Sequence, residues 1–216
     1  MRAVVVASGD LDPSDLRRLD DVQLVVAADG GATGLDRAGR RVDILVGDLD
    51  SVDPGLVDRL AAAGTSIERH PIDKDASDTE LALEAALGRG ATQITVLGAL
   101  GGDRLDHELA NILLLADAAM GPHVRLVRSG TTVRSVGDGR ELEIEAPPGS
   151  TVTLLPIGGE ASGVTACGLR WPLEAATLRI GRSRGLSNVV TEAGASVRVG
   201  RGTLLVVETE STGATA

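Results

Sequence analysis

Short runs of apolar, often β-branched residues alternate with helix-like segments along roughly the first 130 residues of the chain. This alternation is typical of strands and helices that follow one another in a parallel α/β sheet. The expected strands are residues 3–7, 22–28, 43–46, 65–69, 93–99 and 124–128. The expected helices are residues 13–19, 54–64, 78–88 and 104–121.

The pattern changes at about residue 131, after which no long helical period is found. Short strands separated by Gly, Pro and Ser turns are expected at residues 131–136, 141–146, 150–157, 163–168, 176–181, 195–200 and 203–209. The fold class is therefore predicted as α/β. An N-terminal open, mostly parallel α/β (Rossmann-like) sheet domain (residues 1–130) precedes a C-terminal antiparallel β-sandwich or jelly-roll domain (131–210) and a disordered tail (211–216).

Composition limits the cores and the partners of these domains. Hydrophobic residues make up 43% of the chain, but Phe and Tyr are absent and Trp171 is the only tryptophan. The cores are therefore expected to consist of Val, Leu, Ile and Ala. A net charge of −10 argues against nucleic acid and anionic membranes as partners, because both need a basic surface.

The single cysteine and the N-terminus bear on the cellular compartment. Cys167 has no partner for an intrachain disulfide, and we expect a small buried hydrophobe rather than a catalytic thiol. The N-terminal apolar run AVVVA is too short for a signal-peptide core or a membrane span. A cytoplasmic protein is expected.

Acidic residues follow the carboxyl ends of four expected strands. They lie in the segments Asp29-Gly30-Gly31, Gly47-Asp48-Leu49-Asp50, Asp73 to Asp78, and Gly101-Gly102-Asp103-Arg104 with Asp106. Because the carboxyl ends of parallel strands share one edge of the sheet, these acids are predicted to meet in one crevice. Each segment alone fits a turn or a helix cap, and Ser77 with Glu80 fits a capping box. Four in succession favour a ligand site.

An all-oxygen cluster of carboxylates suits Mg²⁺, which in proteins often takes phosphate oxygens as its other ligands. The substrate class is therefore predicted as a nucleoside triphosphate or another polyphosphate. The chain has no Walker A loop, no G-x-G-x-x-G fingerprint after the first strand and no zinc-ligand spacing. If ATP binds, its phosphates must be neutralised by glycine-rich turns and two cations. The candidates are Gly30, Gly31, Gly101, Gly102, Asp103, Arg104 and Lys74.

Six segments, taken in order, resemble one known family. They are AADGGA, GDLDSV, DKDASDTELAL and GALGGDRLDHELANI, followed by GLRWPL and SRGLSN. The ordered set resembles the thiamine pyrophosphokinase (thiamine diphosphokinase) family over nearly the whole chain. The resemblance implies transfer of the β,γ-pyrophosphoryl group of ATP to the hydroxyl of thiamine, giving thiamine diphosphate and AMP. It also implies a homodimer whose α/β domain carries Mg-ATP and whose β domain forms the thiamine pocket across the subunit interface.

The same resemblance implies roles for individual residues. Asp48, Asp50, Asp73 and Asp75 are expected to bind magnesium and polyphosphate, with Asp78 as a further member of this set. Asp29 and Asp106 are expected to line the site, and Arg104 to contact phosphate. Ser187 and Asn188 lie near thiamine, and Trp171 stacks on its aminopyrimidine. Without the resemblance, Trp171 would be read as a core anchor of the β domain. Either Asp106 or Asp75 accepts the alcohol proton, and the sequence does not choose between them.

Three other functions share some of these features. A pterin-type diphosphokinase would need the same phosphate machinery, although the β domain argues against it. A haloacid-dehalogenase-type phosphatase is suggested by Asp48-Leu49-Asp50, but its downstream lysine has no counterpart. A thiamine- or nucleotide-sensing protein would keep the fold without turnover, which the complete set of acids disfavours.

Overall fold

A computed structural model describes residues 1–211, and these form two compact units. The N-terminal unit comprises residues 1–114 and 123–129, and the C-terminal unit comprises residues 115–122 and the chain from residue 130 onward. Most of the tail predicted at residues 211–216 lies outside the described residues. In the described part of the chain, no helix is long and apolar enough to cross a membrane.

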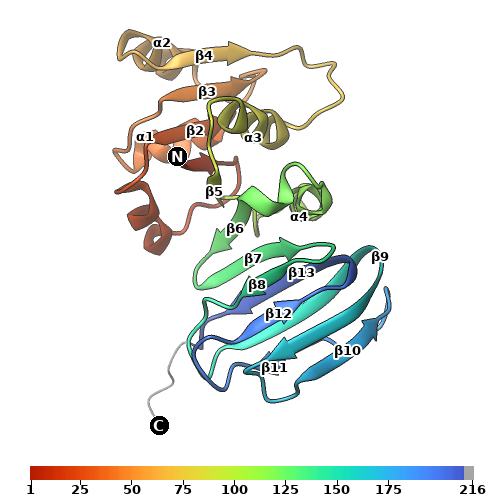
Figure 1. The fold of residues 1–216 in the computed structure, drawn as a ribbon. Coiled ribbons are helices and arrows are strands. Elements are labelled where there is room, and N and C mark those ends of the chain that lie inside the picture. The colour runs from red at the N-terminus through yellow and green to blue at the C-terminus, as the bar shows by residue number, and fades with distance from the viewer. Residues whose placement is uncertain (212–216) are drawn as a thin grey trace. The chain divides into compact units, whose positions relative to one another are not determined.

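The N-terminal unit is built on a parallel sheet in which β1 is central (Figure 1). The strand order is β4-β3-β2-β1-β5-β6, and all five neighbouring pairs are parallel. The strands are β1 (Arg2–Val6), β2 (Leu24–Ala28), β3 (Ile44–Gly47), β4 (Ser66–Arg69), β5 (Gln93–Leu97) and β6 (Val124–Arg128). All six predicted strands of this unit are present. Their carboxyl ends share one edge, as the sequence predicts.

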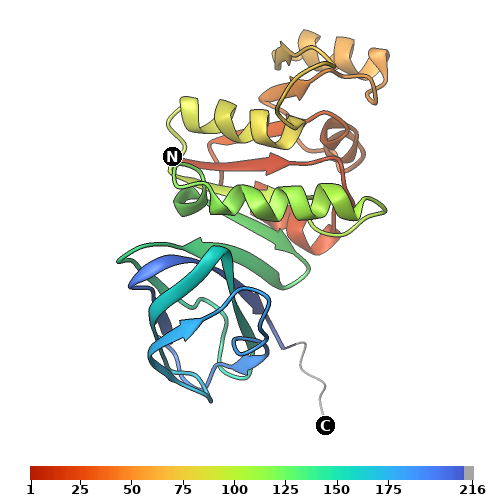
Figure 2. The same ribbon diagram turned by 90° about the vertical axis from the view of Figure 1, so that its right-hand side faces the viewer.

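Helices lie on both faces of this sheet. The α-helices are α1 (Gly31–Arg37), α2 (Pro54–Ala62), α3 (Asp78–Gly88) and α4 (Leu105–Leu113), and the 3₁₀ turns are η1 (Pro13–Leu19), η2 (Leu114–Ala116) and η3 (Gly121–His123). Figure 2 shows α3 and α4 together on one side of the strands, and α1 lies on the other. The predicted helix 13–19 is a 3₁₀ helix, and α1 was not predicted.

The predicted helix 104–121 is also shorter than expected, because α4 ends at Leu113. The carboxylate Oδ1 of Asp117 accepts hydrogen bonds from the backbone N–H groups of Ala119 and Met120. Such local side-chain bonds offer the backbone an alternative to the helical ladder.

The C-terminal unit is antiparallel and is organised around β9. Its strands are β7 (Thr131–Val136), β8 (Glu141–Glu143), β9 (Thr151–Cys167), β10 (Leu173–Leu178), β11 (Asn188–Val189), β12 (Ser196–Arg198) and β13 (Arg201–Thr209). Strands β10, β11, β12 and β13 all pair with β9. The predicted strands 150–157 and 163–168 are thus one strand, and the two units together give an α/β fold with mixed strand pairing.

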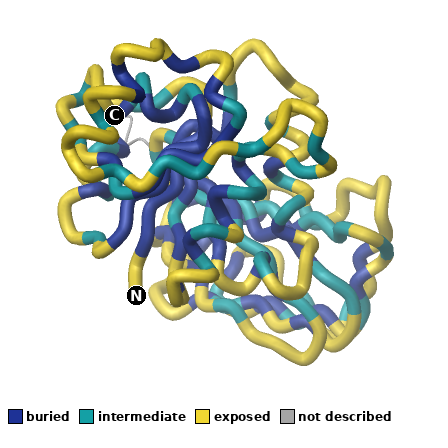
Figure 3. Tube along the Cα trace, turned by 90° about the horizontal axis from the view of Figure 1, so that it is seen from above, coloured by how far each residue is buried: buried dark blue, intermediate teal, exposed yellow. Residues whose placement is uncertain are grey.

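Each unit has an aliphatic core, as the composition predicts (Figure 3). Val4, Ala27 and Leu45 are buried in the N-terminal unit, and Val152 and Leu204 in the C-terminal unit. The prediction for Cys167 is wrong, because its side chain is exposed at the end of β9. Strand alternation places this residue on the opposite face from its buried neighbour Ala166.

Candidate active site

Asp29 is a buried acid at the carboxyl end of β2. Its exposed fraction is 7%, and its φ of +44° lies in the left-handed region that side chains seldom adopt. The backbone N–H of Asp29 donates to the carbonyl of Val46, and Ser51 Oγ donates to Oδ2 of its carboxylate. The other oxygen, Oδ1, is buried with no hydrogen-bond partner. A buried carboxylate oxygen without a donor is costly, so this atom points to a missing cation or donor.

Asp48 and Asp78 come close to Asp29 from two other elements. Asp48 follows β3, and Asp78 is the first residue of α3, whose N-cap Ser77 accepts from the Glu80 N–H at 3.1 Å, which confirms the predicted cap. One carboxylate oxygen of each acid lies within 4.8 Å of the others. Oxygen ligands at this spacing fit a hard divalent cation.

Gly47 allows these acids to approach one another. Its φ is +147°, and a Cβ placed there would lie 3.1 Å from both Asp29 Cβ and Asp78 Oδ1. A side chain at this position would push Asp29 and Asp78 apart. Glycine at this position therefore lets Asp29 and Asp78 lie close together.

Lys74 is paired with two acids of this group. Its Nζ lies 3.0 Å from Asp48 Oδ2 and 3.0 Å from Asp78 Oδ1, although the contact with Asp78 is an ion pair rather than a well-oriented hydrogen bond. The hydrogen bond from Lys74 and the backbone N–H of Asp50 lower the pKa of Asp48. Burial lowers the pKa of Lys74, but Asp78 and Asp48 outweigh it and raise that pKa above its ordinary value.

The other predicted magnesium ligands lie outside this three-carboxylate group. Asp50 is exposed, and the negative charge of Asp48, followed by desolvation, raises its pKa. Asp73 and Asp75 are exposed on the loop between β4 and α3. The structure therefore brings Asp48 together with Asp29 and Asp78, and leaves Asp50, Asp73 and Asp75 exposed and outside this group.

A cavity of about 460 Å³ opens at this edge of the sheet. Asp29 and Asp78 line it, and so do the predicted phosphate-binding residues Gly101, Gly102, Asp103 and Arg104. Gly30 and Gly31 instead line a neighbouring cavity of about 420 Å³ beside α1. A Cβ on Gly31 would meet the Val6 carbonyl oxygen at 2.0 Å, so this glycine is needed for packing of α1 on β1.

The glycine turn after β5 is held by Arg128. Gly101 has a φ of +74°, and a Cβ there would collide with the Arg128 guanidinium at 1.0 Å. Arg128 Nη1 donates to the Leu100 carbonyl oxygen at 3.0 Å. This contact fixes the turn against β6.

Arg104 and Asp106 form an exposed ion pair at the start of α4. Arg104 donates through Nε at 2.9 Å and Nη2 at 2.7 Å to the two carboxylate oxygens of Asp106. The guanidinium holds the pKa of Asp106 far below its ordinary value. Arg104 lines the cavity, and Asp106 is outside the set of lining residues.

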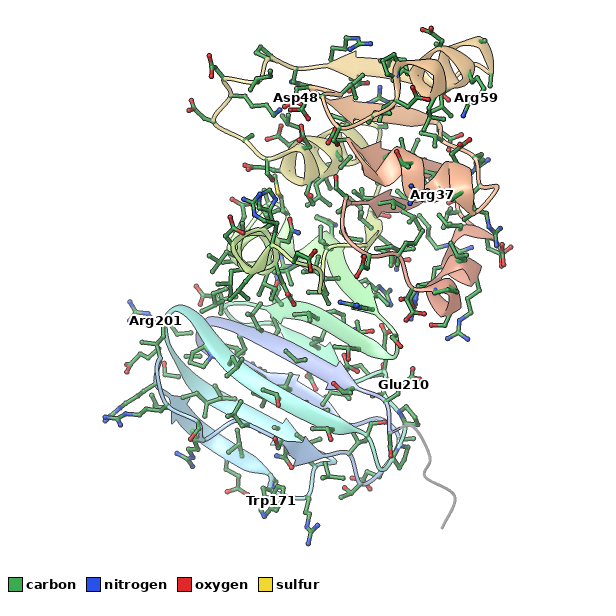
Figure 4. The ribbon with its side chains drawn as sticks, turned by 180° about the vertical axis from the view of Figure 1, so that it is seen from behind. Arg37, Asp48, Arg59, Trp171, Arg201 and Glu210 are labelled. Carbon is green, nitrogen blue, oxygen red and sulfur yellow. The ribbon has the colours of Figure 1, made fainter. Side chains whose placement is uncertain are left out.

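In the C-terminal unit, the predicted thiamine residues cluster around one turn. Trp171 is 55% exposed, so it is not a core anchor, and Figure 4 places it at the margin of its unit. Asn188 is buried, and its side chain bonds the Trp171 backbone: Oδ1 accepts from N–H at 3.0 Å and Nδ2 donates to C=O at 2.7 Å. Ser187 is exposed, with a φ of +56°. Arg170 lies 5.1 Å from the indole centroid.

Three residues of the cavity region were not predicted. Ser51 holds Asp29, and Ser8, at the end of β1, donates to the Ala28 carbonyl oxygen at 3.2 Å. Asn111 is buried on α4 and donates to the Ala99 carbonyl oxygen at 3.1 Å. A polar residue inside the apolar run ANILLL was a signal for Asn111, whereas Ser8 and Ser51 resemble ordinary turn residues.

The geometry therefore combines two kinds of binding surface. The N-terminal unit offers a cavity lined by Asp29, Asp78 and Arg104, and Lys74 is paired with Asp78 next to it, which suits a cation with a polyanion. The C-terminal unit offers an exposed indole that suits a flat, cationic organic ligand.

Comparison with known families assigns both parts of the chain. Residues 16–126 match the family described as "Thiamin pyrophosphokinase, catalytic domain". Residues 141–204 match "Thiamin pyrophosphokinase, vitamin B1 binding domain". The first match alone covers half of the chain.

Individual relatives agree with this assignment. The chain is 26% identical to thiamine pyrophosphokinase of Bacillus subtilis, over 94% of this chain and 96% of the relative. It is 29% identical to thiamine pyrophosphokinase 3 of Oryza sativa subsp. japonica, over 85% and 77%. The crystal structure of the B. subtilis protein superposes with a TM-score of 0.86, covering 98% of this chain and all of that one.

Proposed function

The chain belongs to the thiamin pyrophosphokinase family and is an enzyme of that type, and we propose that it transfers the β,γ-pyrophosphoryl group of ATP to the hydroxyl of thiamine. The products are thiamine diphosphate and AMP. The observation that carries this proposal for the site is the orphaned, buried Oδ1 of Asp29 beside Asp48 and Asp78 at the edge of the sheet.

The residues present fit Mg²⁺, because three carboxylates converge and one buried oxygen lacks a partner. Asp29, Asp48 and Asp78 would hold the ion most directly. The exposed acids Asp50, Asp73 and Asp75 are proposed as further ligands. They contact an ion that enters with the polyphosphate. The bound ion would supply positive charge that neutralises the phosphates.

We place the polyphosphate in the 460 Å³ cavity. Arg104 and Lys74 bind phosphate oxygens, and the turn formed by Gly101, Gly102 and Asp103 contributes backbone N–H groups. Gly30 and Gly31 contact the same ligand through their backbone, from the side of α1.

The transfer itself needs positioning more than a strong base. The thiamine hydroxyl oxygen bonds to the β-phosphorus, the bond from that phosphorus to the α-bridging oxygen breaks, and AMP leaves with this oxygen. The hydroxyl proton passes to a carboxylate. Asp106 and Asp75 are the candidates for this acceptor.

The C-terminal unit binds thiamine in this proposal. The indole of Trp171 stacks on the aminopyrimidine, and Ser187 contacts the ligand beside it. Asn188 was predicted to lie near thiamine, and because its buried amide is bonded to the Trp171 backbone, we assign it the role of holding that turn.

We further propose a homodimer, with residues 1–130 as the Mg-ATP domain and residues 131–210 as a β-sandwich that completes the thiamine site across the subunit interface. Three leucines on one face of α4 support the dimer, since Leu105, Leu109 and Leu113 are 66%, 52% and 57% exposed. The cytoplasm is the proposed compartment, because the single cysteine, Cys167, is free.

The test is to incubate the purified protein with ATP, Mg²⁺ and thiamine and to identify the products by mass. AMP with thiamine diphosphate supports the proposal. ADP with thiamine monophosphate would indicate a simple kinase, free phosphate alone a phosphatase, and binding without turnover a sensor. A hydroxymethyl pterin offered in place of thiamine should give no diphosphate ester.

A further inference from the structure

Lys74 is the only lysine among the 216 residues. Its side chain is 13% exposed, and its ammonium contacts Asp48 and Asp78 at 3.0 Å each. The backbone N–H of Lys74 donates to the Ile72 carbonyl oxygen at 3.0 Å, which folds the loop before α3 so that the side chain reaches inward. The ammonium of the only lysine is thus directed at the carboxylate group.

The two acids bound by Lys74 are two of the three that lie within 4.8 Å of one another. The third acid, Asp29, is 7% exposed, and its Oδ1 has no hydrogen-bond partner. The group therefore carries three negative charges against one positive charge, and one buried oxygen remains unsatisfied. The ammonium thus contacts two of the three acids that a divalent cation bound by this group would use.

A divalent cation and the ammonium cannot share these oxygens without strong repulsion, because both are positive and would be only a few bond lengths apart. Entry of Mg²⁺ alone must displace Lys74 and leave its ammonium without a partner. Entry of Mg²⁺ together with polyphosphate also displaces Lys74 but supplies new phosphate oxygens for it. The two modes of entry therefore differ in whether the lysine stays paired.

We propose that Lys74 is the internal counter-ion of the carboxylate group, holding Asp48 and Asp78 until Mg²⁺ arrives with polyphosphate and then moving to a phosphate oxygen. This inference rests on the proposed function of the site and adds a rule for its specificity. The free protein discriminates against Mg²⁺ alone and accepts the metal as its nucleotide complex.

The choice of lysine suits an exchange of partners. Its ammonium has three equivalent donors on a four-carbon stem, so it can leave one oxygen and bind another with little reorientation. An arginine would hold a carboxylate through two parallel bonds and release it less readily.

The test measures Mg²⁺ affinity by titration calorimetry without nucleotide or thiamine, for the wild type, Lys74→Met and Lys74→Arg. We expect Lys74→Met to bind Mg²⁺ roughly tenfold more tightly, because the competing charge is gone. Lys74→Arg, which keeps the charge and releases a carboxylate less readily, should bind Mg²⁺ no more tightly than the wild type. For Mg²⁺ with α,β-methylene ATP, Lys74→Met should bind roughly tenfold more weakly, because a phosphate contact is lost.

A second measurement uses the unmodified sequence and does not depend on a variant that folds. Protein grown with side-chain-labelled lysine gives a single lysine side-chain NMR signal, that of Lys74. Saturating Mg²⁺ with α,β-methylene ATP should shift this signal.

The inference would be overturned by an unchanged Mg²⁺ affinity in Lys74→Met. A lysine signal that does not shift when the metal–nucleotide complex is added to saturation would also overturn it. Neither readout involves thiamine or turnover. Failure of the proposed activity would appear in the product analysis instead, so the two failures can be told apart.

Discussion

The carboxylate edge of the N-terminal unit and the Trp171 turn of the C-terminal unit are prepared for ligands in opposite ways. At the edge, Asp29, Asp48 and Lys74 are buried or half-buried, and charges are held close to one another. At the turn, the indole is left in solvent while the buried amide of Asn188 fixes the backbone beneath it. Charged groups gain strength from a low-dielectric setting, whereas a stacking surface must be open to its ligand. Asp48→Asn, Trp171→Ala and Asn188→Ala are each expected to affect one region and spare the other.

Asp48→Asn should have the largest effect, because it removes a charge from the carboxylate group while keeping the side-chain shape. We expect kcat/KM to fall about 10²–10³-fold, with the thermal unfolding midpoint nearly unchanged. Steady-state kinetics and calorimetry measure the two quantities. Asp58→Asn, an exposed position on α2, is the matched control. Activity near that of the wild type would remove Asp48 from the metal site.

Leu109→Glu tests whether the exposed leucines of α4 are a protein contact, in contrast to the exposed indole. A carboxylate in the centre of an apolar interface should dissociate the proposed dimer, lowering the mass in sedimentation from twice the chain mass to 22.0 kDa. Thiamine turnover should fall with it if the thiamine site spans the subunit interface. Ile180→Glu, on an exposed residue of the C-terminal unit, is the control. A wild-type monomer would rule out the dimer.

Trp171→Ala should change the binding of thiamine alone. Loss of stacking and cation–π attraction of about 0.5–2 kcal/mol corresponds to a rise in KM for thiamine of roughly 2- to 30-fold. The KM for ATP and the unfolding midpoint should hardly change, because the indole is exposed. Trp171→Phe, which keeps a ring, should recover part of the affinity. Unfolding of Trp171→Ala would return this residue to the role of core anchor.

Asn188→Ala should give the smallest kinetic effect, through a displaced Trp171. Loss of the amide removes the partners of the half-buried N–H and C=O of Trp171 and should cost about 1 kcal/mol of stability. The KM for thiamine should rise less than in Trp171→Ala. The fluorescence of the only tryptophan should also change, which a contact made directly to thiamine would not produce in the free protein.

Periodicity and turn residues predicted most of the fold in the N-terminal unit, where every strand was found. Helix α1 was missed because GATGLDR contains two glycines and is only seven residues long. In the C-terminal unit, Pro156, Gly158 and Gly163 suggested the end of one strand and the start of another. There β9 continues past them, with a register shift against β13 near Thr203.

The sequence predicted an acidic site at the edge of the sheet, but not which acids lie close together there. The rule that parallel strands share an edge placed the acids together, and three of them do converge. Which acids converge depends on the left-handed turn at Asp29, the bare backbone at Gly47 and the cap at Ser77. Asp73 and Asp75 lie on a loop whose path the spacing of residues does not determine. The exposure of Trp171 likewise depends on the antiparallel sheet as a whole.

The most direct test of this division between the two regions compares two affinities in the same variants. Titration calorimetry measures the Kd for Mg²⁺ with α,β-methylene ATP and the Kd for thiamine in the wild type, Asp48→Asn and Trp171→Ala. We predict that Asp48→Asn weakens the nucleotide complex at least about tenfold and leaves thiamine within about twofold, with the reverse for Trp171→Ala. Loss of the same ligand in both variants would contradict the account.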